Sequence, residues 1–112
     1  MIKYYFSHGR SALLNGLKLM NFSKNDFILI PDYLCEIVEI TIKSAILKFI
    51  KYKINDDFSI NIKNLKSKLK LKKSKALLFV NYFGFPQKID EIKKLCKNYN
   101  LKIIEDNSHG HG

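Results

Sequence analysis

The stretch Leu101–Gly112, which reads LKIIEDNSHGHG, decides the fold. Its apolar run Leu101–Ile104 predicts a buried strand, and this run leads directly into an acid and a polar, glycine-rich turn. In a sheet whose strands alternate with helices, ligands bind just beyond the carboxyl ends of the strands. Asp106 and His109 are therefore the residues of this stretch that are most suited to chemistry.

Upstream of this stretch, apolar runs alternate with segments of helical spacing. The expected strands are 27–30, 46–54, 76–80 and 101–104. The expected helices are 11–20, 32–45 with Ile37, Ile40 and Ser44 on one face, a segment that Asn61 caps with Leu65 and Leu69 inward, and 88–99. Helices between apolar strands imply crossover connections and a largely parallel, buried sheet. The predicted class is α/β, and no repeat or linker marks a second domain.

Length and composition fit one packed domain. A chain of 112 residues buries about two thirds of its unfolded surface, and 46% of these residues are hydrophobic. No apolar run approaches the roughly 20 residues that a membrane-spanning helix needs. The first residues, Met1–Arg10, lack the apolar core and cleavage site of a signal peptide. We therefore expect a cytoplasmic protein without membrane association.

The formal net charge of +10 raises the question of nucleic-acid binding. Only Arg10 among the 20 basic residues is an arginine, whereas readers of phosphates and bases favour the bidentate guanidinium group. The lysines are also spread along the chain among Asn, Ile, Phe and Tyr, as the codon usage of an A/T-rich genome would produce. We expect no nucleic-acid partner.

Two cysteines, Cys35 and Cys96, lie far apart and form no CxxC pair, which favours a reducing compartment. Cys96 falls in a helical pattern and is expected to be a small buried hydrophobic residue. A further signal is Gly9-Arg10-Ser11 at an expected helix start. Free backbone N–H groups there could bind an anion, although the residues alone favour an ordinary N-cap.

Four segments occur in an informative order: Gly9–Leu13 (GRSAL), Asp26–Pro31 (DFILIP), Asn81–Pro86 (NYFGFP) and Ile104–Gly112 (IEDNSHGHG). Each falls on an expected strand end or helix start. Each is weak alone, but together they resemble the DegT/DnrJ/EryC1/StrS family of pyridoxal-phosphate-dependent sugar aminotransferases. The resemblance extends over almost the whole chain, which would cover well under half of a full-length member.

The resemblance implies a role for each matching residue. Gly9, Arg10 and Ser11 match the segment that holds the cofactor phosphate at a helix N-terminus. Asp106 matches the acid that bonds the pyridine nitrogen and keeps it protonated, so that the ring withdraws electrons. His109 matches a position, glutamine or histidine in the family, that contacts the phenolic oxygen of pyridoxal phosphate.

The resemblance also implies an architecture, a reaction and partners. Residues 1–112 would form the N-terminal part of the large domain of a fold-type I enzyme, a three-layer sandwich with a largely parallel sheet. The full-length protein would be a homodimer that transfers an amino group from an amino-acid donor to a keto-sugar nucleotide. Such chemistry serves surface-polysaccharide or secondary-metabolite synthesis.

Two departures from the family pattern affect the expected site. The family commonly has an aromatic residue, stacked on the pyridine ring, four positions after the proline of the second segment. Cys35 occupies that position here, so either Cys35 packs on the ring or Tyr33 replaces it, and we favour Cys35. The lysine that forms the Schiff base is expected beyond Gly112, as is the small domain. We therefore assign no catalytic residue here and expect either a truncated product or a partial reading frame, inactive alone.

Three other functions compete with this interpretation. Family members whose lysine is replaced act as sugar dehydratases, and nothing up to Gly112 separates them from aminotransferases. Asp106, His109 and His111, with His8, could form a zinc site, although a solvated glycine-rich tail explains the same residues and we expect no metal. The last is a small basic protein that binds nucleic acid.

Overall fold

The computed structural model describes residues 2–4, 22, 26–34, 36–44, 48–71, 73–82 and 87–106. Its elements are β1 (Ile2–Tyr4), β2 (Phe27–Pro31), α2 (Glu36–Ser44), β3 (Lys48–Tyr52), α3 (Ile62–Leu71), β4 (Ala76–Val80), α4 (Ile89–Asn98) and β5 (Lys102–Asp106). None of the helices in these ranges is long and apolar enough to cross a membrane.

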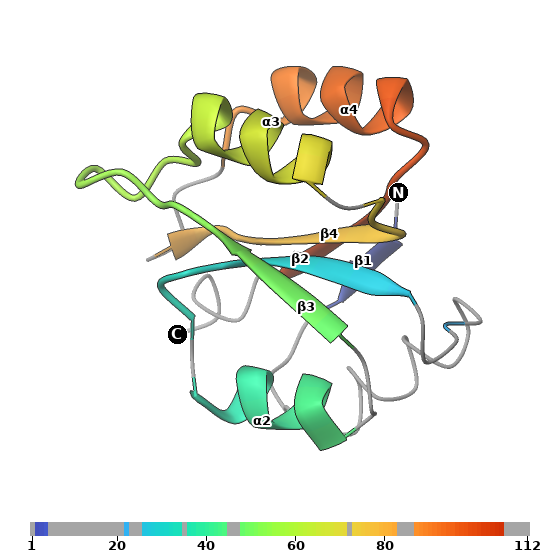
Figure 1. Cartoon of the computed structure of the whole chain (residues 1–112). Helices are drawn as coiled ribbons and strands as arrows, with labels where there is room; N and C mark the ends of the chain where they lie inside the picture. Colours follow the sequence, from blue (N-terminus) through green and yellow to red (C-terminus); the bar gives the residue numbers. More distant parts are fainter. Residues whose placement is uncertain are drawn as a thin grey trace.

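The strands form one five-stranded sheet in the order β1-β5-β4-β2-β3, and every pair of neighbours is parallel. Helices α3 and α4 cover one face of this sheet, and α2 lies on the opposite face (Figure 1). The predicted α/β sandwich of three layers with a parallel sheet is therefore confirmed.

The strands are buried on both faces, as a sheet between two helical layers requires. Residues of β2, β4 and β5 that alternate along the chain belong to a core cluster with α3 and α4. From these three strands this cluster takes Leu29, Leu77, Phe79 and Ile103. Their neighbours Ile28, Leu78 and Ile104, also fully buried, must point to the α2 face, because successive side chains of a strand point to opposite faces.

Most of the elements expected from the sequence occur. The strand expected at 76–80 matches β4, and Asn61 caps α3 as predicted, with its Oδ1 accepting from the backbone N–H of Asn64 at 2.9 Å. The expected helix 11–20 lies outside the described residues. One strand was not expected: β1, whose partner among the described strands is β5.

Helix α2 begins four residues later than expected, because Asp32 forms hydrogen bonds with the neighbouring strand and the residues that follow it. Its backbone N–H donates to the carbonyl of Tyr52 at 2.8 Å, and its Oδ1 accepts from the N–H of Ile54 at 3.0 Å. The chain therefore continues the pairing of β2 with β3 before it turns into the helix. The helix face expected to carry Ile37 and Ile40 is not the buried one at Ile40. Ile40 is 43% exposed, and Thr41 and Ile42 form the buried side of α2.

Helix α4 ends in a Schellman motif. The N–H of Leu101 donates to the carbonyl of Cys96 at 2.8 Å, and the N–H of Asn100 donates to that of Lys97 at 3.3 Å. Asn100 takes the left-handed conformation that the motif requires, with φ of 54°. Leu101 then packs against the core cluster, and the chain enters β5 directly.

Candidate functional site

The topology marks one place on the sheet edge as a binding crevice. Strand β2 is followed by α2 on one face, whereas its neighbour β4 is followed by α4 on the other face (Figure 1). The segments that leave the carboxyl ends of these two strands therefore separate, and such a switch point is where open α/β sheets bind ligands. The residues that follow are Asp32 and Tyr33 after β2, and Asn81 and Tyr82 after β4.

Asp106 lies at this same edge, one strand away. It is the last residue of β5, stands opposite Val80 of β4 and Tyr4 of β1, and is 3% exposed. Its carbonyl accepts from the N–H of Asn81 at 3.1 Å, so both neighbouring strands fix its main chain. Because it alternates with Glu105, its side chain shares the α2 face with Ile104. The structure therefore places a buried carboxyl group at the carboxyl edge, within a strand and not in the expected turn.

The adjacent acid, Glu105, has a different environment. Its Oε1 accepts from Nδ2 of Asn81 at 2.7 Å, and its side chain lies on the α3/α4 face of the sheet. The Oδ1 of Asn81 accepts in turn from the backbone N–H of Gln87 at 3.0 Å. Glu105 thus holds the side chain of Asn81 at the end of β4, and Asp106 faces the opposite side of the sheet.

Three aromatic rings meet at the switch point. Tyr33, Phe58 and Tyr82 contact one another with ring centroids 5.4 to 5.6 Å apart. The hydroxyl of Tyr82 donates to the carbonyl oxygen of Tyr33, which joins the segments after β2 and β4. Burial raises the pKa of Tyr82 above its ordinary value, and the charges of Asp32 and Asp106 raise it further. Tyr82 therefore stays protonated and keeps this hydrogen bond at every physiological pH.

A hollow of about 390 Å³ lies beside these rings. It is lined by Asp32, Tyr33, Ile54, Asn55, Asp56 and Phe58. Tyr33 is 54% exposed and Phe58 is 37% exposed, which is high for rings of this size. The arrangement offers aromatic surface with carboxylates at its rim, next to the crevice.

Of the six cofactor-binding residues expected from the sequence, the structure describes Asp106. The other five, Gly9, Arg10, Ser11, Cys35 and His109, lie outside the described residues. Tyr33, the alternative to Cys35, is described, and its ring packs on Phe58 and Tyr82. All three histidines also fall outside, and the described ranges contain no group of three or more metal-ligating side chains.

Sequence reasoning missed two residues of this region, Phe58 and Gln87. Gln87 precedes α4 and bonds three backbone groups at the end of β4 and in the loop between β3 and α3. A polar residue between the Phe83–Pro86 break and a helix was the available signal in the sequence. Its partners are up to 29 residues away, so no local pattern could have identified them.

Comparisons with known proteins agree on one family. The model of the DegT/DnrJ/EryC1/StrS aminotransferase family matches residues 5–112. A curated relative, dTDP-3-amino-3,6-dideoxy-alpha-D-galactopyranose transaminase from Aneurinibacillus thermoaerophilus, is 28% identical over 109 residues. That match covers 95% of this chain and 29% of the relative, so the chain spans less than a third of the relative's length.

Solved structures show the same fold. DesV from S. venezuelae superimposes with a TM-score of 0.80 at 19% identity, covering 91% of this chain and 28% of that one. PseC from Helicobacter pylori, an aminotransferase of pseudoaminic acid biosynthesis, gives a TM-score of 0.74 at 25% identity, with 89% and 28% covered. Because the family model matches residues 5–112, nearly the whole of this chain, the chain belongs to the DegT/DnrJ/EryC1/StrS aminotransferase family.

Proposed function

We propose that the protein carrying this chain is a pyridoxal-phosphate-dependent aminotransferase that transfers an amino group from an amino acid to a keto-sugar nucleotide. In this proposal residues 1–112 form part of its cofactor-binding large domain, and the full-length protein works as a homodimer in the cytoplasm. The observation that carries the proposal is the buried carboxyl group of Asp106, at the carboxyl end of β5 in a chain of this family.

The described part of the site fits the cofactor at its ring nitrogen. A protonated pyridine nitrogen needs an ionised acceptor, and the pairing is strongest where water is excluded. Asp106 is 3% exposed, and its main chain is fixed by β1 and β4. The start of α2 lies at the same edge and on the same face, directly after Cys35, the residue expected on the ring.

Each residue then has a defined task. Pyridoxal phosphate, when bound, supplies an electron-withdrawing ring for chemistry at the carbon that bears nitrogen. Asp106 would hold the proton on the ring nitrogen, while Gly9, Arg10 and Ser11 would bind the phosphate and His109 the phenolic oxygen. The hydrogen bond from Tyr82 to the carbonyl of Tyr33 would keep the two sides of the crevice together. The family's Schiff-base lysine is expected beyond Gly112.

The test is a titration of the full-length protein with pyridoxal phosphate, followed by the absorbance and circular dichroism of the bound cofactor. Replacing Asp106 with asparagine removes a charged hydrogen bond, a loss of about 1.5–3 kcal/mol, so we expect the cofactor Kd to rise about 10- to 100-fold. Amino transfer to a keto-sugar nucleotide should fall further, because the ring nitrogen would no longer remain protonated.

Glu105→Gln is the matched control. It removes the neighbouring charge, on the other face of the sheet, and keeps an oxygen that can accept from Nδ2 of Asn81. We expect it to bind the cofactor as the native protein does. Equal cofactor affinity in the Asp106→Asn variant and the native protein would refute the proposed role of Asp106. A full-length protein that binds no pyridoxal phosphate would refute the function itself.

A further inference from the structure

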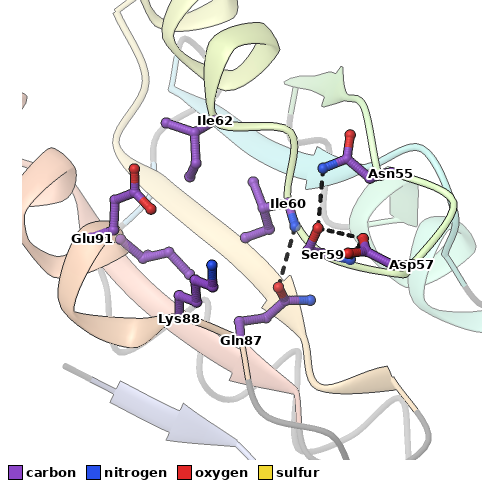
Figure 2. Close-up of a pocket in the computed structure, with 9 residues that line it drawn as sticks. Asn55, Asp57, Ser59, Ile60, Ile62, Gln87, Lys88 and Glu91 are labelled. Carbon is purple, nitrogen blue, oxygen red and sulfur yellow. Dashed lines mark hydrogen bonds between the residues drawn. The ribbon is translucent and has the colours of Figure 1, made fainter.

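The side chain of Gln87 connects two segments that are distant in the sequence. Its Nε2 donates to the carbonyl of Phe58 at 2.8 Å and to that of Val80 at 2.9 Å. Its Oε1 accepts from the N–H of Ile60 at 3.2 Å, which is drawn in Figure 2. One amide group thus joins the end of β4 to the loop between β3 and α3.

The loop fixed in this way carries an unusual residue. Phe58 has φ of 67°, in the left-handed region that is costly for a bulky side chain and persists only where surrounding contacts enforce it. Its N–H donates to the carbonyl of Asn55 at 2.9 Å, and its carbonyl accepts from Gln87. Gln87 is therefore one of the contacts that hold Phe58 in this conformation.

The position of Phe58 matters because its ring contacts one aromatic residue from each side of the crevice. The ring centroid lies 5.6 Å from that of Tyr33, after β2, and 5.6 Å from that of Tyr82, after β4. Tyr82 also bonds the carbonyl of Tyr33, two residues before Cys35. A displacement of Phe58 would therefore shift Tyr33, in the segment that leads to Cys35, and Tyr82. It would thereby disturb the place beside Asp106 where the cofactor ring is proposed to bind.

We propose that Gln87 is a positioning residue for the cofactor site, acting through Phe58 and the Tyr33–Tyr82 contact. By fastening the loop between β3 and α3 to the end of β4, it sets how the segment after β2 lies relative to the strand ends. The inference rests on the proposed function, because the site it aligns is the cofactor site. Gln87 itself touches neither the cofactor nor the substrate.

The test compares Gln87→Met with Lys88→Met in the full-length protein. Methionine has a similar length and none of the three hydrogen bonds, and Lys88 lines the same pocket of about 310 Å³ as Gln87 (Figure 2). In the Gln87→Met variant, the amide of Ile60 should exchange its hydrogen faster. The Kd for pyridoxal phosphate should rise about tenfold, a usual size for coupling between sites, and the circular dichroism of the bound cofactor should weaken. Lys88→Met should change none of these.

A second variant makes the effect of position 87 reversible, because the bonding capacity of its side chain changes with pH. In Gln87→Glu, a carboxylate faces the carbonyl oxygens of Phe58 and Val80, and only its protonated form can donate to one of them. Relative to the native protein at the same pH, its cofactor affinity should be low at pH 8 and recover towards pH 5.5. This comparison also decides the question if Gln87→Met does not fold.

The outcomes separate this inference from the proposed function. Native cofactor affinity and native circular dichroism in Gln87→Met, despite faster exchange at Ile60, would overturn the inference alone, as would a deficit in Gln87→Glu that does not change with pH. Failure of the native full-length protein to bind pyridoxal phosphate would overturn both.

Discussion

Replacing Tyr52 with phenylalanine should lower the free energy of unfolding at pH 7 and leave it nearly unchanged at pH 11. Tyr52 is 1% exposed, and its hydroxyl donates to the carbonyl of Leu78 at 2.7 Å in the core. Phenylalanine keeps the ring packing but removes this buried hydrogen bond. The loss should be about 1.5 kcal/mol, or a shift of about 1 M in the urea midpoint.

The pH dependence follows from the pKa of Tyr52. Burial raises this pKa well above its ordinary value of 10.0, and neighbouring groups, Tyr82 first, raise it further. The hydroxyl therefore stabilises the fold fully below pH 10, and this contribution is lost as the pH rises towards the folded-state pKa, because only the unfolded chain releases the proton. At pH 11, above the ordinary pKa, this loss should be similar in size to the contribution of the hydrogen bond, so the advantage over phenylalanine should largely disappear.

The measurement is urea unfolding of both proteins at pH 7, 10 and 11, with the difference in unfolding free energy as the readout. Titrating groups that do not interact with Tyr52 are present in both proteins and cancel. A difference that stays constant from pH 7 to pH 11 would show that the Tyr52 hydroxyl ionises equally in both states. That result would refute the assignment of a buried, hydrogen-bonded tyrosine.

Two further predictions concern α4 and the turn that ends it. Burial raises the pKa of the Cys96 thiol to about 12. At pH 9 the folded protein therefore has a much smaller fraction of thiolate than the urea-unfolded chain, and iodoacetamide should alkylate Cys96 several hundred-fold more slowly in the folded protein. Equal rates would contradict the burial of Cys96. Asn100 has φ of 54°, a conformation that glycine adopts easily and alanine does not. Asn100→Gly should therefore raise the free energy of unfolding by about 0.5 kcal/mol, and Asn100→Ala should lower it by about 1 kcal/mol. Equal stability of the two variants in urea unfolding would argue against the left-handed turn.

Sequence patterns predicted the elements wherever one local signal dominates. The run Ala76–Val80 is apolar throughout, and it became β4 with the predicted bounds because a strand covered on both faces needs no alternation. Asn61 followed by Leu65 and Leu69 predicted α3 in the same way, since the cap and the buried spacing lie within one helix.

The errors arose where distant partners decide the structure. Asp32 resembled a helix start, but hydrogen bonds to β3, about 20 residues away, keep it beside the sheet. Asp106 was expected in a turn, and pairing with both β1 and β4 extends the strand to include it. The burial of Asp106 and the hydrogen bonds of Gln87 could not be predicted, because neither depends on neighbours in the sequence.

The pairing of β1 with β5 has a consequence for how the protein folds during synthesis. Ile2 stands opposite Ile104, so the first and the last of the described strands lie side by side. Bringing these ends together closes a loop of nearly the whole chain, whereas β2, β3 and β4 can associate over much shorter separations. On the ribosome, β1 must therefore wait unpaired until β5 has emerged. Among the described strands, the edge that carries Asp106 would be the last to assemble.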